Sequence, residues 1–148
     1  MANMKDGTRY TYNKVSRTTR QSNDTLTVDP DFTHPVKAGE TWTFHLLLRV
    51  TTTAAADFKF TIGAPSGSVG WAVAERIAVG GRTLIDFQTT GFAFTDASAA
   101  DESVYEITGV MRVIADGTLA LRWAQNTSAA VDTYVHAGSF MELAQLSS

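Results

Sequence analysis

The side chains of this sequence that could bind a metal ion or move a proton begin with its three histidines, His34, His45 and His136. No two of them are two or four residues apart, which are the spacings that turn two imidazoles of one strand or helix toward the same ion. We interpret them as unrelated residues of the surface or of sheet edges. The histidines therefore predict no metal site.

Carboxylates are the next candidates for chemistry. Asp24, Asp29 and Asp31 lie close together, and Asp29-Pro30-Asp31 could offer oxygen ligands to calcium. Their spacing differs from that of an EF-hand, and aspartate before proline commonly starts a turn, so we favour the turn. Two carboxylates on different strands could also converge for glycoside hydrolysis, but the sequence does not single out such a pair.

A serine nucleophile needs a neighbouring base and a sharply turned backbone. Ser66-Gly67-Ser68-Val69-Gly70 is superficially similar to a nucleophile elbow, but its glycines are displaced from the required spacing, and we interpret it as a turn. The chain has no cysteine and no glycine-rich phosphate-binding motif. We expect that the protein is not an enzyme and that it uses no cofactor and no small-molecule substrate.

Basic and aromatic residues alternate near the N-terminus. Residues 1–22 carry five basic side chains against one acid, a charge of +4, whereas the remaining 126 residues carry seven basic and fourteen acidic side chains, a charge of −7. We predict that residues 1–22 form an extended or partly disordered arm that binds the acidic surface of a neighbouring protein; nucleic acid is the less favoured partner. The residues predicted to make this contact are Lys5, Arg9, Tyr10, Tyr12, Lys14, Arg17 and Arg20.

The segments that follow show the two-residue period of strands with one buried face. In Thr41–Thr51, large apolar side chains alternate with polar ones, and only Leu47 breaks the pattern. Similar segments recur between turn signals, and no segment has the pattern of an amphipathic helix. We predict a single domain over residues 23–148, an all-β antiparallel jelly-roll sandwich of about eight or nine strands. The alternation assigns the tryptophans to its core: Trp42, Trp71 and Trp123.

Some apolar side chains fall on the outward side of the predicted strands. They are Leu47, Val110, Ala120 and Ala124. An outer face as apolar as this is often covered by another subunit. We therefore predict that these residues lie at a subunit interface, with a homotrimer favoured.

Composition sets the remaining limits. Apolar residues make up 44% and charged residues 18% of the 148 residues, as in a folded globular domain. No apolar run is long enough to span a membrane, and Met1–Lys14 lacks the apolar centre of a signal peptide. We expect a complete short protein that is made in the cytoplasm and has no contact with a membrane.

Several short motifs, taken in order, resemble a group of small phage structural proteins. The match covers about residues 22–143 with gaps and is loose across 78–103, while residues 2–20 do not clearly match. The motifs are Thr25-Leu26, Asp29-Pro30-Asp31-Phe32, Pro35-Val36, Glu40-Thr41-Trp42-Thr43-Phe44, Ala55-Ala56-Asp57-Phe58-Lys59, Ala64-Pro65-Ser66-Gly67, Leu121-Arg122-Trp123-Ala124-Gln125 with Ser128, and Val135-His136-Ala137-Gly138-Ser139. The resemblance implies a jelly-roll virion protein, commonly trimeric.

The resemblance and the residues together lead to one expected function. We expect a capsid decoration, or cement, protein that is made in the bacterial host cytoplasm and binds the major capsid protein on the outer head surface as a homotrimer. The alternative is a tail-fibre or receptor-binding module that recognises host surface polysaccharide. Copy number and location in the virion distinguish the two.

Overall fold

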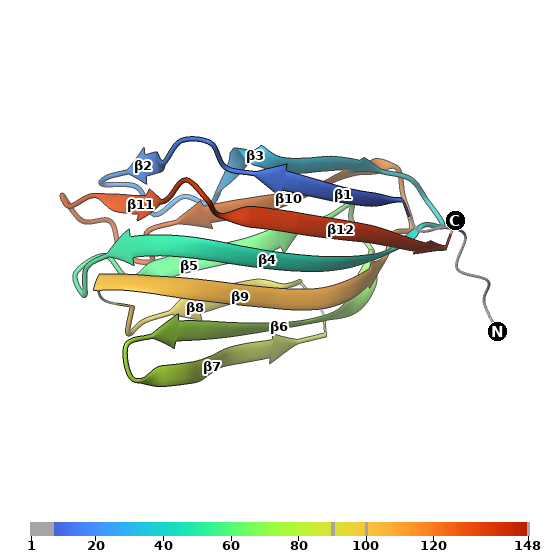
Figure 1. The fold of residues 1–148 in the computed structure, drawn as a ribbon. Coiled ribbons are helices and arrows are strands. Elements are labelled where there is room, and N and C mark those ends of the chain that lie inside the picture. The colour runs from blue at the N-terminus through green and yellow to red at the C-terminus, as the bar shows by residue number, and fades with distance from the viewer. Residues whose placement is uncertain (1–7, 90, 100, 148) are drawn as a thin grey trace.

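The chain folds into two stacked antiparallel sheets (Figure 1). The computed structural model describes residues 8–89, 91–99 and 101–147, and these residues form twelve strands and no helix. No helix that could cross a membrane is present in this part of the chain. The strands are β1 (Arg9–Asn13), β2 (Thr18–Arg20), β3 (Thr27–Val36), β4 (Thr41–Thr52), β5 (Phe58–Gly63), β6 (Val69–Ala78), β7 (Gly81–Gln88), β8 (Ala93–Asp96), β9 (Asp101–Arg112), β10 (Gly117–Ala124), β11 (Thr133–Val135) and β12 (Phe140–Ser147).

The pairing of the strands is nested. β1 pairs with β12, β3 with β10, β4 with β9, and β5 with β8, all antiparallel. This is one long hairpin whose two arms are rolled up together, with the β6–β7 hairpin inserted near its tip. Successive paired strands lie alternately in the two sheets. The predicted all-β jelly-roll sandwich is confirmed; the strands are more numerous than expected partly because β1 and β2 lie within residues 1–22, which were predicted to form an arm.

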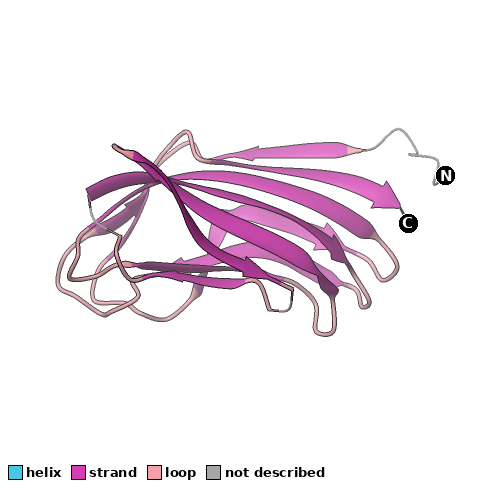
Figure 2. Ribbon diagram, turned by 90° about the horizontal axis from the view of Figure 1, so that it is seen from below, coloured by secondary structure: helices cyan, strands magenta, loops and turns pink. Residues whose placement is uncertain are grey.

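The two sheets differ in width. The large sheet has eight strands, in the order β1-β12-β4-β9-β6-β7 with β11 and β2 at one corner, whereas the small sheet has the order β3-β10-β5-β8. The strands run lengthwise in both sheets, and the connecting loops gather at the two ends (Figure 2). The β6–β7 hairpin adds two strands to the large sheet next to β9 and makes it wider than the small sheet.

Alternation along the strands builds the core between the sheets. Along β4, every second side chain from Trp42 to Val50 is buried, and the side chains between them are half-buried or, at Arg49, exposed. Phe58 of the small sheet contacts Tyr105 of the large sheet, with ring centroids 5.0 Å apart. Trp42 and Trp123 are buried as predicted, at 2% and 0% exposure. Contacts between aromatic rings thus join the two sheets.

The N-terminal segment differs from the predicted arm. β1 pairs with β12 through five consecutive residues, and β2 pairs with β11. Residues 9–13 and 18–20 therefore belong to the large sheet and are not separate from the domain. One cause is that Lys14 and Arg20 meet acceptors within the sandwich, a match that the local sequence does not reveal.

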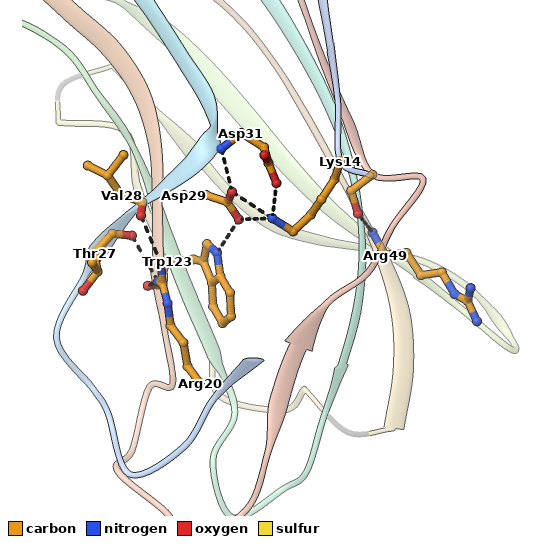
Figure 3. A network of polar contacts seen from close by, with 9 residues as sticks. Lys14, Arg20, Thr27, Val28, Asp29, Asp31, Arg49 and Trp123 are labelled. Carbon is orange, nitrogen blue, oxygen red and sulfur yellow. Dashed lines mark hydrogen bonds and ion pairs between the residues drawn. The ribbon is translucent and has the colours of Figure 1, made fainter. Parts of the chain in front are cut away.

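Lys14 is the clearest case of such a match. Its side chain is fully buried, and its Nζ lies 2.9 Å from Oδ1 of Asp29 and 2.8 Å from Oδ2 of Asp31 (Figure 3). Nε1 of Trp123 donates a hydrogen bond of 3.0 Å to the same Asp29 carboxylate. A buried charge needs this degree of pairing, because desolvation of a lone ion costs several kcal/mol. The network connects the end of β1 to both β3 and β10.

Arg20 acts in a similar way one strand later. Its guanidinium stacks over the ring of Trp123, 3.9 Å from the centroid, and donates hydrogen bonds to the carbonyl oxygens of Trp123, Thr27 and Val28 (Figure 3). These carbonyls belong to paired strands of the small sheet. Arg20 therefore connects the N-terminal segment to the small sheet at a second point.

A second buried carboxylate lies on the other side of the sandwich. Asp96 of β8 accepts hydrogen bonds from the hydroxyl of Tyr105 at 2.8 Å and from Arg76 at 2.7 Å. Burial and this carboxylate raise the pKa of Tyr105 far above its ordinary value, so the phenol stays protonated as a donor. This contact joins β8 of the small sheet to β6 and β9 of the large one.

Substitution of Lys14 tests the importance of the first network. We expect Lys14→Met to lower the free energy of unfolding by about 3–5 kcal/mol, because the Asp29 carboxylate is left buried without its cation. Urea unfolding followed by tryptophan fluorescence measures this loss. The double variant Lys14→Met/Asp29→Asn removes the charge and should regain most of the stability, and Lys37→Met, the same change at an exposed lysine, should stay within about 0.5 kcal/mol of wild type. Equal stabilities of Lys14→Met and Lys37→Met would contradict this account.

Candidate functional site

The groups proposed for chemistry do not meet in one place. His34 forms a hydrogen bond with Tyr12, and His136 forms one with Thr51 near the end of β4. His45 lies on the large sheet and faces away from the core. Among residues 8–89, 91–99 and 101–147, no three histidine or acidic side chains are arranged to hold a metal ion. Asp29 and Asp31 surround the ammonium of Lys14 instead.

The remaining sequence candidate for a reactive group is a turn, as predicted. The backbone NH of Ser68 donates to the carbonyl of Pro65 at 3.1 Å, and Ser66 and Gly67 form the turn between them. Gly67 has a φ of 82°, a left-handed conformation that favours glycine. The segment leads directly into β6 and not into a helix, so it has no nucleophile-elbow geometry.

His34 lies in an aromatic cluster between the edges of the two sheets. The hydroxyl of Tyr12 is 2.6 Å from its Nδ1, and its ring centroid lies 4.3 Å from that of Tyr10 and 4.8 Å from that of Trp42. Burial lowers the pKa of His34, and the nearby Glu40 carboxylate opposes that shift. The imidazole therefore packs as a neutral ring.

The surface that could carry out a function is the outer face of the large sheet. We define this outer face as the side of β1, β12, β4, β9, β6 and β7 that points away from the small sheet. Strand register arranges its side chains in rows: Val110 lies between Thr43 and Trp71, and Thr108 lies between His45 and Val73. A third row places Glu106 between Leu47 and Glu75.

Large apolar side chains are exposed on this face. Val69, Trp71, Leu84 and Phe87 are 53%, 41%, 61% and 56% exposed. The rings of Trp71 and Phe87 stack, with centroids 6.4 Å apart and planes 29° from parallel. Half-buried apolar residues continue the surface across the sheet: Leu47, Val73, Val104, Val110 and Phe140. Contiguous apolar surface of this kind marks contacts with other molecules.

A shallow groove of about 560 Å³ crosses the same face. Trp71 and Val110 line one part of it, and Arg9, His45 and Glu142 line another. Gly109 lies at its floor, where an added Cβ would collide with the ring of Phe44 and the carbonyl of Trp71. Glycine thus allows the strands to approach closely under the groove.

Charged residues on the outer face are already paired with one another. Arg82 contacts Glu75 and also Glu106, at 3.2 Å from the latter. The imidazole of His45 lies 3.9 Å from the carboxylates of both Glu106 and Glu142. Exposed ion pairs of this kind contribute little to the stability of the fold. Their main effect is on which partner surfaces have charges complementary to this face.

The predicted arm contacts divide into two groups. Arg9, Tyr10 and Arg17 have exposed side chains and remain available to a partner, Tyr10 at 38% exposure. Arg17 also lies over the ring of Tyr134, 4.5 Å from its centroid. Lys5 lies outside the described residues.

The other three arm predictions need correction. Lys14 is buried in its ion pair, Arg20 is held over Trp123, and Tyr12 is half-buried against His34. None of the three presents its charged or polar end to a partner, because each end is already bound within the chain. The prediction of a contact role is therefore wrong for Lys14 and Arg20 and unsupported for Tyr12.

The predicted interface residues divide in the same way. Leu47 and Val110 lie half-buried on the outer face, whereas Ala120 and Ala124 of β10 are buried within the chain at 4% and 0% exposure. The assignment of Ala120 and Ala124 to a subunit interface is wrong, because both side chains are buried within the single chain.

The assignment of Trp71 to the core is also wrong. Ala72 and Ala74 occupy the buried side of β6 at 0% exposure, which leaves Trp71 and Val73 on the outer face. Since both sides of this segment are apolar, alternation alone does not say which side is buried. The turn at Gly80-Gly81 predicts a hairpin that pairs the strand of Leu84 and Phe87 with β6, as observed, but the sequence did not identify these two residues as part of an exposed surface.

Comparison with known proteins finds only distant structural likeness. No family model and no curated protein sequence matches the chain. Among solved structures, Eiger TNF from S. frugiperda is similar with 12% identity and a TM-score of 0.41, over 95% of this chain and 92% of that chain. The VP2 subviral particle of infectious bursal disease virus is similar with 12% identity and a TM-score of 0.25, over 97% of this chain but 41% of the VP2 chain. Identities and TM-scores this low carry no information about the function of this chain.

The state of His34 predicts how stability depends on pH. Its pKa is lowered in the folded chain from an ordinary 6.5, so the unfolded chain binds the proton more readily. The stabilising effect is complete above about pH 6.5 and is lost as the pH falls below it, by at most about 1.4 kcal/mol per pH unit. His136, whose pKa is lowered mainly by burial, acts in the same direction.

Thermal unfolding between pH 7.5 and pH 5.5 measures this dependence. We expect the Tm of the wild-type chain to fall over this range, and the fall to be smaller for His34→Gln and smallest for His34→Gln/His136→Gln. An unchanged slope in the double variant would show that other groups control the pH dependence.

Proposed function

We propose that this chain is a structural protein of a virus particle, a decoration subunit that binds the outer surface of a bacteriophage head as a homotrimer and stabilises contacts of the major capsid protein. The observation that carries the proposal is the outer face of the large sheet. Val69, Trp71, Leu84 and Phe87 are exposed there beside half-buried apolar neighbours, and such a surface calls for a protein partner.

The fold suits this role because it provides a rigid body. Aromatic contacts and two buried carboxylates join the sheets, so a partner meets a surface that is already ordered. Binding to a preorganised surface loses less conformational entropy than binding to a mobile segment. No catalytic group is needed for such a role, and we propose that the protein is not an enzyme.

Contact with the capsid is proposed for the exposed residues of the N-terminal segment. Arg9 and Tyr10 of β1 and Arg17 before β2 have exposed side chains. Arginine and tyrosine are enriched at protein interfaces because they combine apolar area with directed hydrogen bonds. An acidic surface on the major capsid protein would complement the two arginines.

Trimer formation strengthens weak contacts. Three copies of the same contact, carried on one rigid trimer, act with a high effective concentration once the first has formed. Avidity can exceed the affinity of a single contact by about 10²–10⁴ without any new interaction. A decoration subunit can therefore hold neighbouring capsomers through modest individual contacts.

The second candidate function is adhesion to host surface polysaccharide as a tail-fibre or receptor-binding module. The observation that favours it is the groove, where Trp71 offers an aromatic face beside His45, Arg9 and Glu142. Aromatic faces stack on the apolar sides of sugars, while charged and polar groups bind hydroxyls. The location of the protein separates this role from decoration.

Analysis of purified virions tests the main proposal. We expect quantitative mass spectrometry to find hundreds of copies per particle and antibody labelling to mark the head. A few to a few dozen copies at the tail would instead favour the adhesion module. Absence from purified particles would overturn both.

Charge reversal tests the proposed capsid contact. We expect Arg9→Glu/Arg17→Glu to weaken binding to capsids that lack this protein by about tenfold or more, and wild-type binding to weaken as salt concentration rises. Sedimentation of the protein with capsids measures both effects. The matched control is Lys37→Glu/Arg122→Glu, the same charge change at exposed residues elsewhere. Equal binding by the two double variants would remove the N-terminal segment from the contact.

A further inference from the structure

Lys14 and Asp29 bring an amine and a carboxyl group into contact in the interior of the sandwich. Both side chains have 0% exposure, and Nζ of Lys14 lies 2.9 Å from Oδ1 and 3.0 Å from Oδ2 of Asp29 (Figure 3). Because the nitrogen is almost equally far from both oxygens, it lies next to the carboxyl carbon, Cγ, that joins them. Two reactive groups held in contact and in one orientation react much faster than free ones.

Both oxygens of the Asp29 carboxyl group accept hydrogen bonds from fixed donors. The backbone NH of Asp31 donates to Oδ1 at 3.1 Å, and Nε1 of Trp123 donates to Oδ2 at 3.0 Å. Attack of a nucleophile on Cγ places more negative charge on these oxygens, and donors already in position stabilise such charge in a site without water. The two donors therefore favour attack on the carboxyl group of Asp29.

Asp31 presents a second carboxylate to the same amine. Its Oδ2 lies 2.8 Å from Nζ of Lys14, which is within reach for proton transfer. The side chain of Asp31 is 33% exposed, so it can exchange protons with solvent, whereas the side chain of Asp29 is fully buried. Two neighbouring carboxyl groups in such different surroundings can take different roles in one reaction. Asp29 is placed to be attacked, and Asp31 is placed to carry protons.

We propose that Lys14 and Asp29 form an intramolecular amide bond, with Asp31 as the proton carrier and the ion pair as the reactant state. Asp31 takes a proton from the ammonium group, and the electron pair freed on Nζ attacks Cγ of Asp29. Asp31 returns this proton, and then a second proton from the nitrogen, to one oxygen of Asp29. The bond between Cγ and that oxygen breaks, and the oxygen leaves with both protons as water. The nitrogen keeps one proton, Asp31 is regenerated, and no other reactant is consumed.

The surroundings of the pair favour the bonded product. A buried ion pair carries the desolvation cost of two charges, whereas an amide is uncharged. The ring of Phe32, with its centroid 5.6 Å from Nζ, and the indole of Trp123 help to enclose the site, and exclusion of solvent protects the bond from hydrolysis. The bond links the residue that follows β1 of the large sheet to β3 of the small sheet. This inference goes beyond the proposed function and holds for a capsid or a polysaccharide partner alike.

Mass spectrometry of the purified full chain tests the bond. We expect the intact mass to be lower by one water molecule than the sequence requires. Trypsin does not cut after a lysine whose amine is acylated, so its digest should contain the peptide of residues 10–17 joined to the peptide of residues 21–37. The joined peptides distinguish the amide bond from loss of water within a single aspartate. A wild-type chain with its full sequence mass and no joined peptides would overturn the inference.

Substitution of Asp31 tests its role as the proton carrier. Asp31→Asn keeps the size of the side chain but removes the group that accepts the proton, and we expect it to slow bond formation by about 100-fold. The fraction of joined peptides, followed with time after synthesis, measures the rate, and an unchanged circular dichroism spectrum shows that the variant is folded. The matched control is Asp24→Asn, the same change at an exposed aspartate, which should form the bond as the wild type does. Equal rates for the two variants would overturn the role of Asp31.

Discussion

The buried ion pair between Lys14 and Asp29 is the interaction on which the N-terminal half of the sandwich depends. Stacked sheets are joined by contacts between side chains rather than by backbone hydrogen bonds. Lys14 leaves the large sheet and reaches the carboxylate of a small-sheet strand, which Trp123 also contacts. Asp96, with Arg76 and Tyr105, does the same on the opposite side. Each side of the sandwich is thus connected by a fully paired buried carboxylate.

Local pattern predicts part of this architecture and misses another part for a physical reason. β4 was predictable because its side chains face the core and the outer surface in turn, so apolar and polar residues alternate along the strand. β1 was not, since the partner of Lys14 is 15 residues away in a different sheet, and a run of basic residues looks the same whether it is solvated or buried against acids. Whether the N-terminal residues belong to the domain depends on pairs such as Lys14 and Asp29, whose members are distant in the sequence.

The same limit explains the outcome at the outer face. Leu47 and Val110 were found because large apolar side chains stood at outward positions of clear strands. Trp71 was wrongly assigned to the core because its strand is apolar on both sides, and the side that is buried carries the small alanines. For Ala120 and Ala124, alternation gave the direction of the side chain but not whether its neighbours cover it. Coverage is a property of the assembled sheet.

The nested pairing of the strands has a consequence for the order in which the molecule can form. β1 pairs with β12, and β3 pairs with β10. These outer strands of the long hairpin can therefore pair only after segments more than 80 residues further along the chain are available. During synthesis the early strands leave the ribosome without their partners. The β4–β9 and β6–β7 pairs near the tip join closer segments, so the fold is expected to nucleate there and close outward, with the N-terminal strand docking last.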